Sequence, residues 1–186
     1  GQPHNGLLPA GFSAEHLGPN DYYYWDNFWA IAGFQAAARI MKRFGETAAA
    51  ETFFRQAADF QAALEKSLAQ IPEQRKKGCL PASPYRRLDP GAIGSLVADY
   101  PLSLYPPENP SIINTARFLM ENCFQQGGFF QDMIHSGINA YLTLAIAQTL
   151  LRYGDSRYRE LIRTVAALAS PTGQWPEAIH PITGGG

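Results

Sequence analysis

Apolar positions recur at spacings of three and four along most of this 186-residue chain, which is the pattern of amphipathic helices. The first stripe begins at Trp25 and is followed by Gly45, a residue type that commonly stops a helix. A second stripe runs from Phe53 to Leu68, and Pro72 ends it at the latest. The pattern therefore predicts two consecutive long helices in the first part of the chain.

Four further helices are expected after a loop over residues 71–90 that is rich in proline and basic residues. The same spacing places them at Ala92–Tyr100, Ile112–Phe124, Ile138–Thr149 and Tyr158–Ala169. No segment alternates convincingly between apolar and polar residues, so the sequence predicts no sheet. The fold class that follows is all-α.

Two helix junctions resemble each other and suggest a weak internal repeat. Arg-Phe-Gly-Glu at 43–46 and Arg-Tyr-Gly-Asp at 152–155 each join an apolar helix to an amphipathic one. Such pairs are typical of stacked antiparallel hairpins. A solenoid of the tetratricopeptide type is the alternative, but these hairpins do not repeat at a short fixed period. Their long aromatic connections favour a toroid of helical hairpins with functional loops at one rim.

Composition narrows the classes of partner and cofactor. Apolar residues make up 46% of the chain, and the formal net charge is −1, which gives no electrostatic reason to expect nucleic acid or an anionic membrane. No apolar stretch reaches the length of a membrane span. The two cysteines and four histidines lack metal-ligand spacing, so no metal or other cofactor is expected, and the cellular compartment stays open.

The ends of the sequence suggest a piece of a longer protein. The chain starts at Gly1 and stops at Gly186, inside what looks like a functional loop. We therefore expect residues 1–186 to form a single, partial domain.

Two carboxylates in aromatic settings are the candidates for chemistry. Asp26 follows Trp25, and Glu177 follows Trp175 and Pro176. Hydrolysis of a sugar acetal needs one carboxyl to protonate the leaving oxygen and another to activate water or attack carbon. Aromatic neighbours raise the pKa of a donor by desolvation, and they offer flat faces to a sugar ring. Each carboxylate also has a simpler interpretation, as a first-turn helix acid and as an ordinary loop carboxylate.

Helix order would bring further residues to the same place. If six helices alternate in direction between Asp26 and Glu177, the start of the first and the end of the last lie on one face. The loop before the fifth helix, with His135 and Asn139, lies there too, and both could bind sugar hydroxyls. A structural histidine is the alternative for His135. Asp89, before a proline and a glycine, is interpreted as a turn residue.

Three segments resemble the six-hairpin (α/α) toroid glycosidases, the group that contains glucoamylases, trehalases and processing α-glucosidases. They are Tyr-Trp-Asp-Asn-Phe-Trp at 24–29, Ser-Gly-Ile-Asn-Ala-Tyr-Leu at 136–142 and Glu-Ala-Ile-His-Pro-Ile-Thr-Gly at 177–184. The resemblance implies the C-terminal half of such a toroid and a carbohydrate substrate. It also implies inverting hydrolysis of α-linked glucosides or oligosaccharides, with Asp26 as general acid and Glu177 as general base.

Some alternatives stay open beside this resemblance. Glucoamylases usually show two adjacent acids at the donor site, whereas Asn27 follows Asp26 here. In some members a Trp-Asp pair binds sugar hydroxyls, which is the second role for Asp26. The stacking residues that fit best are Trp25 and Trp175. A non-catalytic sugar-binding or scaffold toroid, a phosphorylase and an epimerase are the competing functions.

Overall fold

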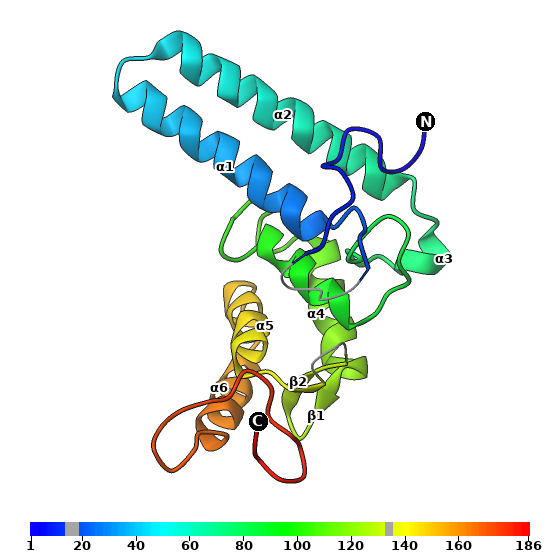
Figure 1. Ribbon diagram of the computed structural model, residues 1–186, viewed down its shortest axis with the longest axis vertical. Coiled ribbons are helices and arrows are strands. Elements are labelled where there is room, and N and C mark those ends of the chain that lie inside the picture. The colour runs from blue at the N-terminus through cyan, green and yellow to red at the C-terminus, as the bar shows by residue number, and fades with distance from the viewer. Residues whose placement is uncertain (14–18, 133–135) are drawn as a thin grey trace.

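The computed structural model describes residues 1–13, 19–132 and 136–186, and about 52% of this part is helical (Figure 1). The helices are α1 (Tyr24–Arg43), α2 (Thr47–Ala69), α3 (Glu73–Lys76), the 3-10 helix η1 (Pro90–Ala98), α4 (Pro110–Asn122), α5 (Ala140–Arg152) and α6 (Tyr158–Ala167). The strands are β1 (Phe124–Gln125), β2 (Gly128–Gln131) and β3 (Gly137–Ile138).

Two helical hairpins form the ends of the molecule. α1 and α2 lie side by side and project from the body, whereas α5 and α6 pack together at the other end (Figure 1). The hairpins turn at Gly45 and Gly154, whose φ angles of +80° and +85° favour glycine. These are the two junctions that the sequence singled out.

The buried helix η1 lies between the hairpins and contacts α1, α4 and α5. Seven of its nine residues are buried, and four of these join one core cluster with apolar side chains from α1, α2, α4, α5 and α6. The N-terminus of η1 is capped by the side chain of Asp89, and Pro90 occupies the first turn. At its C-terminal end, Asp99 accepts a hydrogen bond of 2.7 Å from Arg152 of α5.

The prediction of an all-α chain is wrong, because β1, β2 and β3 form a three-stranded antiparallel sheet. Phe124 pairs with Phe129, and Phe130 pairs with Ile138. Strands of two to four residues are too short to show the alternation of apolar and polar residues that marks a strand in a sequence. In β2, three of the four residues are buried, so the strand does not have one buried and one exposed face. Ile138, expected in the fifth helix, therefore lies in β3.

The predicted toroid is wrong as well. A toroid would need further antiparallel helix pairs between the two hairpins. The chain between them contains residues 71–109, which hold seven of the 14 prolines. Proline breaks helices in their interior, and this stretch instead forms loops, the short α3 and η1. The described helices do not form an arc of alternating inner and outer helices (Figure 1).

Within the described ranges, no helix combines the length and the apolar character that crossing a membrane requires.

The contact between Asp99 and Arg152 gives a first prediction. The Asp99 side chain is 1% exposed, and its second oxygen has no hydrogen-bond partner among the described residues. Arg152→Ala would leave a buried carboxylate without its counter-charge, and we expect a loss of roughly 3 kcal/mol in the free energy of unfolding. Urea denaturation measures this loss.

The matched control is Arg157→Ala, which removes an arginine–aspartate pair whose arginine side chain is 44% exposed. Exposed pairs contribute about 0–1 kcal/mol. Equal losses for the two variants would contradict the structural role of the Asp99–Arg152 pair.

Candidate functional site

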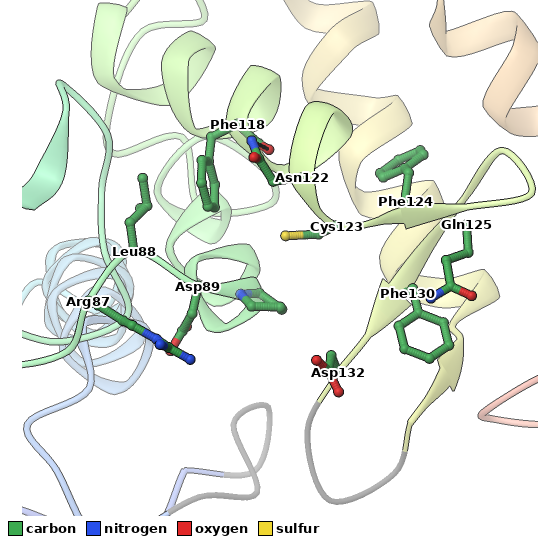
Figure 2. Close-up of a pocket in the computed structure, with 11 residues that line it drawn as sticks. Arg87, Leu88, Asp89, Phe118, Asn122, Cys123, Phe124, Gln125, Phe130 and Asp132 are labelled. Atoms are coloured by element: carbon green, nitrogen blue, oxygen red, sulfur yellow. Dashed lines mark hydrogen bonds between the residues drawn. The ribbon is translucent and has the colours of Figure 1, made fainter.

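A pocket of about 420 Å³ lies between the loop before η1, the end of α4 and the β1–β2 hairpin (Figure 2). We call it the two-aspartate pocket. Its size is within the ~300–1,000 Å³ range of ligand pockets. Two carboxylates, a guanidinium, a thiol and three aromatic rings line it: Asp89, Asp132, Arg87, Cys123, Phe118, Phe124 and Phe130.

Asp89 is held on both carboxylate oxygens. Oδ1 accepts the backbone N–H of Gly91 at 2.9 Å. Oδ2 accepts Nε and Nη2 of Arg86 at 3.1 and 2.8 Å. The Asp89 side chain is 13% exposed, so the pair is only partly screened by solvent. Charge-assisted bonds of this kind are shorter and stronger than neutral ones, and they fix the orientation of the carboxylate.

Asp132 follows β2 and faces Asp89 and Arg87 from the other side of the pocket (Figure 2). It is exposed and makes no hydrogen bond or ion pair with the described residues. Arg87 is likewise exposed and unpaired within the described ranges. The pocket thus combines one fixed carboxylate with a carboxylate and a guanidinium that are available to a ligand.

Cys123 gives a second indication that the two aspartates converge. Burial, together with the negative charges of Asp89 and Asp132, raises the pKa of its thiol to about 11. Both carboxylates therefore act on the same side chain, which is 7% exposed and lines the pocket.

The structure does not bring Asp26 and Glu177 into contact. Asp26 lies half-buried in the first turn of α1 without a hydrogen-bond partner among the described residues, and burial raises its pKa. Glu177 is exposed, on a segment that pairs with β3 through Ile138 and Ile179. The start of α1 and the segment after α6 lie in different parts of Figure 1, and neither carboxylate lines the two-aspartate pocket.

Trp25 lines a second hollow, of about 350 Å³, between α1, η1 and α5. We call it the aromatic groove. It also contains the rings of Trp29, Tyr100 and Tyr141, which are 40%, 41% and 66% exposed. Trp175 lies elsewhere, and its indole N–H donates to the Val165 carbonyl of α6 at 2.7 Å. The two expected stacking residues, Trp25 and Trp175, thus do not line the same hollow.

Asn139 has a structural task in this fold. Its side-chain oxygen caps α5 by accepting the N–H of Leu142 at 2.8 Å, and its amide donates to Gln131 at 3.3 Å. The side chain is buried, so a contact with sugar stays a prediction. His135 lies outside the described residues.

No cluster of three or more His, Cys, Asp or Glu side chains that could hold a metal ion occurs within the described ranges.

Comparisons with protein-family models, with curated proteins and with solved structures found no match to this chain. The family resemblance of the three segments stays a prediction.

The raised pKa of Asp26 predicts how its charge affects stability. The folded chain holds this proton more tightly than the unfolded chain, so ionisation favours unfolding. Asp26→Asn should therefore raise the melting temperature at pH 7. The gain should vanish below the ordinary aspartate pKa of about 3.9, where both states are protonated. Thermal melts from pH 3 to 7 measure it, and a gain independent of pH would contradict this account.

The two-aspartate pocket predicts a change in thiol reactivity that is independent of any enzymatic activity. In a Cys79→Ser background, Asp132→Asn should lower the pKa of Cys123, because one of the negative charges that oppose thiolate formation is removed. Alkylation by iodoacetamide at pH 8, followed by mass spectrometry of the Cys123 peptide, should then be faster. Asp155→Asn, which removes a carboxylate outside the pocket, is the control. An unchanged rate for Asp132→Asn would show that Asp132 does not face Cys123.

Proposed function

We propose that this chain carries a glycoside hydrolase site in the two-aspartate pocket. The observation that carries the proposal is the placement of two carboxylates, from segments far apart in sequence, on opposite sides of one cavity with aromatic walls. Asp89 and Asp132 then take the roles that the two-carboxylate mechanism requires. The substrate class, an α-linked glucoside or related oligosaccharide, comes from the resemblance of the sequence.

Asp89, which is held by Arg86, and Asp132, which is unpaired among the described residues, suit different steps of the hydrolysis. Asp132, in its protonated form, donates a proton to the glycosidic oxygen as the bond between that oxygen and the anomeric carbon breaks. The proton that the base takes up returns to Asp132 through solvent before the next turnover. Asp89, oriented by Arg86, accepts a proton from the water whose oxygen attacks the anomeric carbon. The products are two hydroxyl-bearing sugars, and water supplies the oxygen and both protons. Inversion is taken from the resemblance of the sequence, and it requires the two carboxyl groups to stand roughly 6.5–9.5 Å apart.

The walls of the pocket fit a sugar ring. Phe118 and Phe130 offer apolar surface to its C–H groups, and Arg87 can donate hydrogen bonds to its hydroxyls. A ring bound there would exclude bulk water, apart from the attacking water molecule, and this strengthens the electrostatic action of the carboxylates.

Asp26 and Glu177 form the competing assignment. The raised pKa of Asp26 suits a proton donor, but a donor needs a base across the same substrate. The start of α1 and the segment after α6 lie in different parts of the fold, and neither Asp26 nor Glu177 lines the two-aspartate pocket, so Asp89 and Asp132 are favoured.

A carbohydrate-binding role without catalysis is the second candidate function. The aromatic groove favours it, because four aromatic rings from three elements surround one hollow. Trp25 would be a stacking residue in this second case.

The proposal predicts that Asp89→Asn and Asp132→Asn each lower kcat by ~10²–10⁴-fold in the full-length protein. Asparagine caps helices about as well as aspartate, so Asp89→Asn should still fold. Asp132→Asn should impair a natural disaccharide more than an aryl glycoside, whose leaving group needs less protonation. Steady-state kinetics on maltose and an aryl α-glucoside measure both effects.

The comparison variants are Asp26→Asn and Glu177→Gln, which should retain most of the wild-type kcat. If these two lose activity while the pocket variants keep it, the site belongs to Asp26 and Glu177. If the wild-type protein binds oligosaccharides without cleaving them, carbohydrate binding without catalysis is the function that remains.

A further inference from the structure

We propose that Arg86 is a positioning residue that fixes the carboxylate of Asp89 to the start of α1. This inference rests on the proposed function of the two-aspartate pocket. It gives two neighbouring arginines different roles. Arg86 forms an ion pair with Asp89, whereas Arg87 is unpaired among the described residues and available to a ligand.

Arg86 determines how the Asp89 carboxylate is oriented. Two of its nitrogens, Nε and Nη2, donate to the same oxygen, Oδ2, at 3.1 and 2.8 Å. The capping bond from Gly91 uses the other oxygen, Oδ1. Removing Arg86 would therefore keep the cap of η1 but release the oxygen that the guanidinium holds.

The other side of Arg86 contacts the aromatic start of α1. Its Nη1 lies 3.4 Å from the hydroxyl of Tyr23, and its guanidinium carbon lies 6.0 Å from the centre of that ring. Tyr23 is 1% exposed, so this partner is itself fixed in the core. A cation over a buried tyrosine ring gains both electrostatic and packing energy.

The loop that carries Arg86 is tied to the same place by its backbone. The Tyr24 N–H donates to the Ala82 carbonyl at 2.9 Å, and the Arg86 N–H donates to the Ser83 hydroxyl at 3.2 Å. Ser83 in turn donates to Asp21. The position of the Asp89 carboxylate thus depends on residues 21–24, which precede or begin α1.

A misplaced base should reduce turnover more than substrate binding, because proton transfer depends steeply on geometry. Arg86→Ala should lower kcat roughly 10- to 100-fold in the full-length protein, with KM changed less than about 2-fold. Guanidinium ions at millimolar, non-denaturing concentration should restore part of this kcat by occupying the vacated site. They should not restore Asp89→Asn, which lacks the carboxylate.

Arg157→Ala is the matched control. It also removes an arginine whose Nε and Nη2 bind one aspartate, Asp155, at 3.0 and 2.7 Å, but outside the pocket. This variant should keep the wild-type kcat with or without guanidinium. Arg86→Lys keeps the charge but not the two-pronged contact, so it should fold and show an intermediate kcat.

The outcomes separate the inference from the proposed function. If Asp89→Asn keeps its activity, the proposed site is wrong. If Asp89→Asn is inactive while folded Arg86→Ala or Arg86→Lys turns over like the wild type, only the positioning role is overturned. A loss in Arg86→Ala that guanidinium does not reverse, with wild-type turnover in Arg86→Lys, would also overturn it.

Discussion

The short helix η1 is held at both ends by an aspartate–arginine pair, and the packing of the other helices depends on where it lies. At its start, Asp89 caps the helix and binds Arg86. At its end, Asp99 binds Arg152 of α5. A 3-10 helix has poorer hydrogen-bond geometry than an α-helix, so a buried one of nine residues needs such support from outside. Because η1 contacts α1, α4 and α5, the two pairs also fix the hairpins relative to each other.

The same constraint links the fold to the proposed chemistry. Asp89 uses one carboxylate oxygen to cap η1 and the other to bind Arg86, and it also lines the two-aspartate pocket. A carboxylate that the fold already orients needs little reorganisation when a substrate arrives, which is the basis of electrostatic preorganisation. The less constrained Asp132 is exposed across the pocket and can adapt to the leaving group.

The sequence predicted the long helices from their three-and-four spacing, and Phe28, Leu64, Leu119 and Ile146 are buried. The first stripe does not hold to its end, because Ile40 and Phe44 are exposed. It could not predict the sheet, whose strands are too short to alternate. The toroid prediction failed at residues 71–109. The short helix expected at Ala92–Tyr100 is the buried 3-10 helix η1, and it is not a member of an antiparallel helix pair. Asp89 was interpreted as a turn residue and Asp132 was missed. The sequence Asp-Pro-Gly at 89–91 does signal a helix cap, but nothing local shows that Asp132 faces it.

The central claim is that a sugar binds between Asp89 and Asp132. The transition state of glycoside hydrolysis carries positive charge at the anomeric centre, so a cationic iminosugar should bind where two carboxylates converge. The most direct measurement is a crystal structure of the full-length protein soaked with a saturating iminosugar. The account predicts electron density for the inhibitor in the two-aspartate pocket, with its ammonium group between the two carboxylates. Density at the aromatic groove, density beside Asp26 or Glu177, or an empty two-aspartate pocket would contradict it.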